Sequence, residues 1–136
     1  MKPTSARERL EAALGRIDDP KGEGARACLT VYRDQAKAAA DAADARAKAG
    51  VSLGPLDGTI VSIKDLFDVR GTSTTAASRV RQNHRADADA PTIARLRASG
   101  AIVVGKTNLH EFALGTTNEE SAFGPVRHPL DPSRSP

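Results

Sequence analysis

Lys64 is the residue whose type and setting in this sequence point most directly to chemistry. It lies within residues 60–66, a segment rich in β-branched side chains that predicts a strand. Successive strand side chains alternate between faces, which places Lys64 and Asp65 on opposite sides. Burial favours the neutral form of a lysine, and a neutral amine near pH 7 can act as a general base. On an edge strand the same side chain would instead extend into water, and the pattern leaves both arrangements open.

A second lysine lies in residues 100–107, Gly-Ala-Ile-Val-Val-Gly-Lys-Thr, which match the phosphate-loop pattern GxxxxGK[ST]. Such a loop needs flexible backbone between its glycines, whereas Ala-Ile-Val-Val favours an extended strand. A phosphate loop also follows a strand and opens a helix, but this segment follows a helical pattern and is itself the predicted strand. We therefore interpret the match as coincidental and expect Lys106 and Thr107 not to bind nucleotide.

The residue types that hold metals are scattered along the chain. His84, His110 and His128 are far apart and have no cysteine or carboxylate at ligand spacing. The His110-Glu111 pair lacks the second histidine of a zinc-protease motif. Cys28 is the single cysteine, and we expect it to be a small buried side chain in an alanine-rich helix. The sequence predicts no metal site and no cofactor.

Composition narrows the class of protein. The chain has 136 residues, of which 39% are hydrophobic, enough for the core of one ordinary domain. Its 20 Lys and Arg residues are interleaved with 17 Asp and Glu residues, so no concentrated basic face for nucleic acid is expected. No apolar run approaches the ~18 residues of a membrane span, and the first residues lack the apolar core of a secretion signal. We expect a cytoplasmic protein without a membrane partner.

Helical patterns occupy the first fifty residues. Ser5 and Glu8 have the spacing of a capping box, and the hydrophobic residues that follow share one helical face. Residues 18–22 should end this helix. A second helix is predicted from Gly24 to Gly50. Its alanine stripe would permit close packing against another surface.

The composition changes after residue 50 and predicts a βαβ unit. Residues 60–66 and 101–104 are expected to be parallel strands, bridged by a helix over about residues 91–99. Pro91 suits the first turn of that helix, and Gly100 suits its end. This order is typical of an α/β fold. Two strands alone bury little surface, so we expect the remaining strands of the sheet beyond residue 136.

Several motifs of residues 54–134 occur in the order of one enzyme family. They are Gly-Pro-Leu-Asp-Gly at 54–58, Ile-Lys-Asp at 63–65, a Gly-x-x-Thr-Thr-x-x-Ser pattern at 71–78, Asp-Ala-Pro at 89–91, Leu-Arg-Ala-Ser-Gly-Ala at 96–101, Gly-Lys-Thr-Asn at 105–108, Glu-Phe-Ala at 111–113 and Ser-Ala-Phe-Gly-Pro at 121–125. In these motifs the sequence resembles the amidase signature family. Collinear matches over some eighty positions are far more specific than any single motif.

The resemblance implies a fold and a division of the chain. Residues 51–136 would form the first, incomplete part of an α/β/α domain with a mixed, largely parallel sheet. Residues 1–50 would be a helical lead-in, since they match the family only in their general helical character.

The resemblance also implies a Ser–cis-Ser–Lys triad, in which an unprotonated lysine activates a serine nucleophile through a bridging serine. Lys64 matches the family lysine. The two serines belong to glycine-rich segments expected beyond residue 136, and Ser133 and Ser135 lack that glycine context. We therefore expect residues 1–136 alone to hydrolyse no amide.

Three functions remain open from the sequence. The first is an amidase that converts a small-molecule amide to an acid plus ammonia or an amine, with a homodimer left open for the full-length enzyme. The second is the glutaminase-type component of a tRNA-dependent amidotransferase, although Glu119-Glu120 and His128 depart from the residues common in that branch. The third is a non-catalytic protein whose alanine-lined helices dock on a partner.

Overall fold

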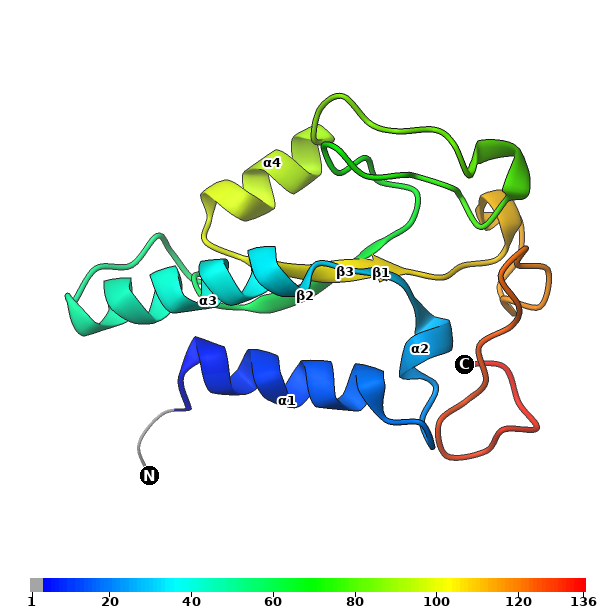
Figure 1. Ribbon diagram of the computed structural model, residues 1–136, viewed down its shortest axis with the longest axis horizontal. Helices are drawn as coiled ribbons and strands as arrows, with labels where there is room; N and C mark the ends of the chain where they lie inside the picture. The colour runs from blue at the N-terminus through cyan, green and yellow to red at the C-terminus, as the bar shows by residue number, and fades with distance from the viewer. Residues whose placement is uncertain (1–3) are drawn as a thin grey trace.

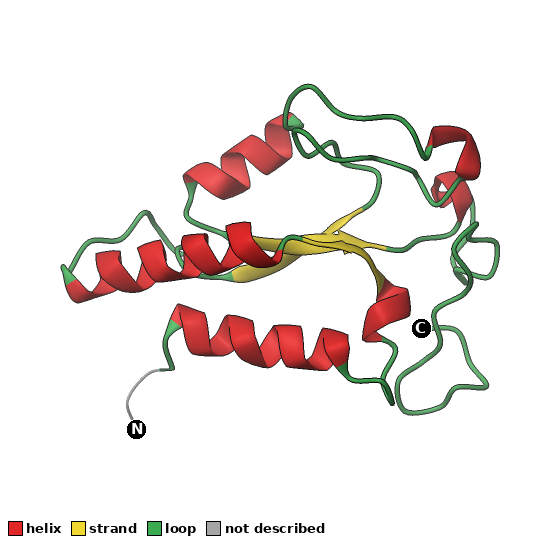
Figure 2. Cartoon of the chain, viewed as in Figure 1, coloured by secondary structure: helices red, strands yellow, loops and turns green. Residues whose placement is uncertain are grey.

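The computed structural model describes residues 4–136 and forms three layers, with a small sheet between helices (Figure 1). Figure 2 shows the sheet at the centre and long loops at the end of the molecule near the C-terminus. The helices are α1 (Ala6–Asp18), α2 (Gly24–Ala27), α3 (Arg33–Lys48) and α4 (Pro91–Ala98). The strands are β1 (Cys28–Val31), β2 (Ile60–Lys64) and β3 (Ile102–Thr107). Short 3-10 turns cover Arg79–Arg81 and Glu111–Ala113.

The three strands form one mixed sheet in the order β1-β3-β2. β2 and β3 are parallel and are connected through α4, so the predicted βαβ unit is confirmed. β2 ends at Lys64, two residues earlier than predicted, and β3 continues to Thr107, three residues further than predicted. β1 pairs antiparallel with the other edge of β3, which makes β3 the central strand.

The prediction of one helix from Gly24 to Gly50 is wrong, because β1 interrupts it. Cys28 lies in this strand and is half-buried, and burial raises the pKa of its thiol. The pairing depends on Gly105 in β3: a Cβ there would lie 2.2 Å from the Thr30 carbonyl oxygen of β1. The partner that makes these residues a strand is therefore distant in the sequence, which local helical periodicity cannot reveal.

One core lies between the sheet and the pair α1 and α3. Leu10 and Leu14 of α1 pack there with the alanine stripe of α3 and with two side chains of β3. The stripe residues are Ala36, Ala40 and Ala43. Because this stripe is buried inside the chain, it is not an exposed docking face. The predicted capping box is confirmed, since Ser5 Oγ accepts from the Glu8 amide and the Glu8 carboxylate accepts from the Ser5 amide.

A second core lies on the α4 side of the sheet and contains Ile93 of α4, Ile63 of β2 and Val103 of β3. A bulge shifts the register of β2 against β3, so that Val61 pairs with Val103 but Ser62 pairs with Gly105. As a result Lys106 is the partner of Ile63, and Thr107 is the partner of Lys64. The bulge therefore decides which lysine faces which side of the sheet.

Candidate active-site cleft at the end of β2

Lys64 is the last residue of β2, and its side chain is exposed. It lines a cleft of about 420 Å³ beyond the ends of the two parallel strands. The other lining residues are Thr107, Asn108, Leu109, His110, Gly115, Thr116 and Asn118. Among the described strands β2 is an edge strand, so the structure shows the exposed arrangement of Lys64 and not the deeply buried one. The carboxyl ends of parallel strands are a common place for ligand sites in α/β folds.

The wall of this cleft is fixed by side-chain amides. Asn108 Nδ2 donates to the Gly124 carbonyl at 2.9 Å, and Asn108 Oδ1 accepts from Ser121 Oγ at 2.6 Å. Asn118 Oδ1 accepts from the Val126 amide at 2.6 Å. These bonds hold the segment after β3 against residues 121–126 and give the cleft a defined wall.

Strained backbone occurs in the loops that follow β2 and β3, and one of the strained residues, Asn118, lines the cleft. Ala76, Ala77, Phe112, Ala113 and Asn118 all have positive φ, a conformation that side chains other than glycine seldom adopt. The two consecutive pairs are joined directly, because the Phe112 amide donates to the Ala76 carbonyl at 2.9 Å. Such conformations cost free energy and cluster at functional sites, which favours this end of the sheet as the site.

Among residues 4–136, the fully buried lysine is Lys106. Its Nζ lies 3.2 Å from Asp65 Oδ1 and donates to the Ser73 carbonyl and to Thr74 Oγ1, both at 2.6 Å. The sequence draws attention to Lys106 through the false phosphate loop and through the family motif at 105–108, and neither predicts that it is buried. Lys106 follows Val-Val-Gly in a predicted interior strand, and this position is the signal that could have indicated its burial. The sequence does not indicate that Asp65 is its partner.

The phosphate-loop interpretation is excluded by this geometry. Residues 100–107 form a turn followed by β3, and they come after α4 instead of opening a helix. The Lys106 ammonium is enclosed by protein groups and has no exposed surface for a phosphate. The strand predicted for this segment is confirmed, and it is the reason why we interpret the motif as coincidental.

The three histidines are not brought together. His110 lines the cleft with Nε2 3.5 Å from Glu120, whereas His84 lies 3.7 Å from Asp68 and His128 belongs to the C-terminal loop. Within residues 4–136, no three metal-ligating side chains are grouped as a metal site requires. The same residues include no helix with the length and apolarity of a membrane span.

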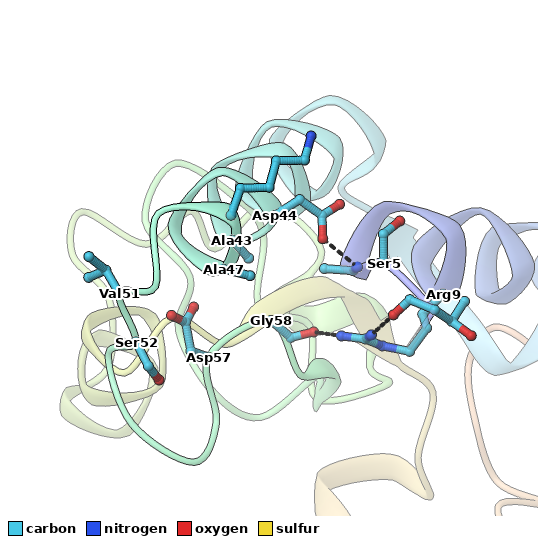
Figure 3. Close-up of a pocket in the computed structure, with 12 residues that line it drawn as sticks. Ser5, Arg9, Ala43, Asp44, Ala47, Val51, Ser52, Asp57 and Gly58 are labelled. Carbon is cyan, nitrogen blue, oxygen red and sulfur yellow. Dashed lines mark hydrogen bonds between the residues drawn. The ribbon is translucent and has the colours of Figure 1, made fainter. Parts of the chain in front are cut away.

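A larger cleft of about 550 Å³ lies at the opposite end of β2, between the start of α1, the end of α3 and the turn at 54–58 (Figure 3). Three of its charged side chains have partners within the protein, while Lys48 lines it without a bond to another residue of 4–136. Arg9 donates to the Gly58 carbonyl at 2.9 Å, Asp44 accepts from the Ala6 and Arg7 amides, and Asp57 is paired with Arg46. We interpret this cleft as a seam between structural elements, because these bonds join α1, α3 and the turn across it.

The family model for Amidase matches residues 8–136. The chain belongs to the Amidase family. A glutamyl-tRNA(Gln) amidotransferase component from Anaeromyxobacter dehalogenans is 47% identical over 135 residues, which are 99% of this chain and 27% of that relative. The chain thus spans about a quarter of the length of this curated relative.

Solved structures of the Amidase family agree with the fold. A chain from a vestigial protein complex connected with the evolutionary origins of an s-triazine catabolic enzyme matches with a TM-score of 0.88 and 40% identity, over 97% of this chain and 29% of that one. The native peptide amidase from Stenotrophomonas maltophilia matches with a TM-score of 0.81 and 34% identity, over 96% of this chain and 28% of that one. The predicted α/β/α fold and family are confirmed.

Proposed function

We propose that the protein hydrolyses a carboxylic amide to an acid plus ammonia or an amine, with Lys64 as the proton acceptor. The observation that carries this proposal is the position of Lys64 at the carboxyl end of β2, exposed to a cleft walled by Thr107, His110 and Asn118. Membership of the Amidase family and the similarity to a peptide amidase support the reaction class.

In the proposed mechanism Lys64 is unprotonated when the amide binds. It takes a proton through a bridging serine from the serine that attacks the amide carbonyl. The lysine returns this proton to the leaving nitrogen, which departs as ammonia or an amine, and water then releases the acid. Ser133 is not proposed as either serine, because its hydroxyl bonds Asp131 in the C-terminal loop and it does not line the Lys64 cleft.

The glutaminase-type component of a tRNA-dependent amidotransferase is the second candidate. The specific observation that favours it is the 47% identity over 135 residues to a glutamyl-tRNA(Gln) amidotransferase component. Under this proposal the amide substrate is glutamine, and the ammonia is passed on to a further acceptor. Glu120 and His128, which depart from the residues common in that branch, weigh against it.

Ammonia release by the whole protein tests both candidates. Glutamine, a C-terminally amidated dipeptide and propionamide should be compared for the wild type, Lys64→Ala and the control Lys37→Ala, which alters a partly exposed lysine of α3. We expect Lys64→Ala to remove turnover and Lys37→Ala to keep it. Turnover restricted to glutamine would favour the glutaminase, and normal turnover by Lys64→Ala would overturn the mechanism.

A further inference from the structure

Two charged side chains are fully buried within residues 4–136, and they are each other's partners. Lys106 is 0% exposed and Asp65 is 2% exposed. Burying an ion pair costs desolvation free energy, and apolar residues of the same volume often stabilise a protein as well or better. The pair therefore calls for an explanation other than general stability.

Hydrogen bonds from a third segment complete the pair. Lys106 also donates to the Ser73 carbonyl and Thr74 Oγ1, and Asp65 Oδ2 accepts from the Thr75 amide at 3.0 Å and from Thr75 Oγ1 at 2.5 Å. These bonds join the end of β2 and the end of β3 to the loop at 73–75. Asp65 Oδ1 has the ion pair with Lys106 as its polar contact, and the bonds of Asp65 Oδ2 and Lys106 Nζ fix the positions of both side chains.

This network lies directly behind the cleft. Asp65 follows Lys64, and Lys106 precedes Thr107, while Lys64 and Thr107 are register partners that both line the cleft. The main chain of Asp65 is also held, because its amide donates to the Thr107 carbonyl at 3.0 Å and its carbonyl accepts from the Ala76 amide at 2.9 Å. Since neighbouring strand side chains point to opposite faces, an inward Asp65 turns Lys64 toward the cleft.

We propose that the Lys106–Asp65 pair positions Lys64 for proton transfer. This inference rests on the proposed function of Lys64 as the base. Neither member of the pair contacts the substrate in this proposal; both act through the backbone that carries Lys64. A catalytic group displaced by about 1 Å can lose about 10²-fold in rate, so loss of the pair should lower kcat far more than it changes KM.

A double-mutant cycle in the whole protein separates positioning from a general structural role. Asp65→Asn keeps the size of the side chain but removes the charge that pairs with Lys106. Asp65→Asn is introduced both into the wild type and into the Lys64→Ala variant. Propylamine is added to raise the residual turnover of Lys64→Ala. The matched control is Asp68→Asn, which removes a carboxylate of the same loop that lies outside the network. Melting temperatures of all variants report folding.

We expect Asp65→Asn to lower kcat by about 10²-fold in the wild type and to have no further effect once Lys64 is absent. An equal loss in both backgrounds, or wild-type kcat in Asp65→Asn, would overturn the proposal. Thr75→Val removes one hydroxyl bond to Asp65. It should lower kcat by a smaller factor in the wild type and again have no effect in Lys64→Ala. This variant therefore tests the proposal even where Asp65→Asn fails to fold. Normal turnover by Lys64→Ala would instead overturn Lys64 as the base, and the role of the pair with it.

Discussion

Each end of β2 carries an aspartate paired with a basic side chain, but the two pairs have different surroundings. Before the strand, Asp57 accepts two hydrogen bonds from Arg46 of α3. The side chain of Asp57 is 10% exposed and that of Arg46 is 26% exposed. After the strand, Asp65 and Lys106 form a pair that is almost completely closed to water. The first pair fastens a helix to a turn, whereas the second fixes the backbone beside Lys64.

The difference shows that the degree of burial distinguishes two roles of an ion pair. A pair that water reaches is screened and can rearrange at little cost, so it suits a fastening between elements. A desolvated pair tolerates neither the loss of a partner nor a shift in geometry, so it suits a place where a neighbouring atom must stay fixed. A lysine amine lines the cleft at each end of β2, Lys48 before the strand and Lys64 after it, and Lys64 is the one that adjoins the buried pair.

The largest expected effect is on turnover. Lys64→Arg should lower kcat by about 10³-fold or more, because a guanidinium stays protonated and cannot accept a proton. Asp57→Asn, at the other end of the same strand, should leave kcat within about threefold of the wild type. Steady-state ammonia release measures both variants. Comparable losses from the two changes would remove the functional distinction between the ends.

The second effect is on stability. Lys106→Met should lower the free energy of unfolding by ~3–5 kcal/mol, because it leaves the Asp65 carboxylate buried without its partner. Arg46→Met should cost clearly less, since water can solvate Asp57. Urea unfolding followed by circular dichroism gives both values. The contrast between the pairs would fail if Arg46→Met proved the more damaging change.

A smaller effect is expected where Gly100 meets the Asp57 turn. Gly100 has φ of +80°, and a Cβ there would lie 2.3 Å from Asp57 Oδ1. Gly100→Ala should therefore cost about 1–3 kcal/mol of stability while kcat is retained. Gly15→Ala in α1 is the control, because a Cβ at Gly15 meets no atom within 4 Å and alanine favours the helix. A Gly100→Ala protein as stable as the wild type would contradict the described contact.

The smallest effect concerns acid. Hydrogen bonds from Arg46 lower the pKa of Asp57 from 3.8 to about 2. The pair's stabilisation of the folded protein is thus complete above the pKa of Asp57 in the unfolded chain. It is lost as the pH falls through the pKa of Asp57 in the folded protein. The difference in melting temperature between the wild type and Asp57→Asn should shrink from about pH 5 to about pH 2. A difference that stayed constant over this range would show that the pair contributes no pH dependence.

The elements that could be predicted from the sequence are those whose signals are local. The capping box at Ser5, the helix that begins at Pro91 and the parallel strands β2 and β3 each follow from spacing within a few residues. Lys64 could be singled out because an alternating strand pattern and the family motifs coincide at one residue.

What could not be predicted depends on contacts between distant residues. β1 is a strand because β3 lies beside it, and Gly105 permits that approach. The loops after β2 and β3 are joined by bonds such as the one between Phe112 and Ala76, which hold the backbone in conformations that sequence alone disfavours. Lys64 is exposed because it ends an edge strand, and the register that places Lys106 beside Ile63 depends on a bulge at Gly105, whose pairing with Ser62 the sequence does not indicate.

The strand order has a consequence for how the chain folds during synthesis. β3 is the central strand but the last of the three to leave the ribosome, and β1 and β2 do not pair with each other. Helices α1 and α3 can associate early, whereas every ladder among these strands must wait for residues 102–107. During that delay β1 and β2 are unpaired edges that other nascent chains could join. The position of β3 in the chain therefore sets how long the edges of β1 and β2 stay unpaired.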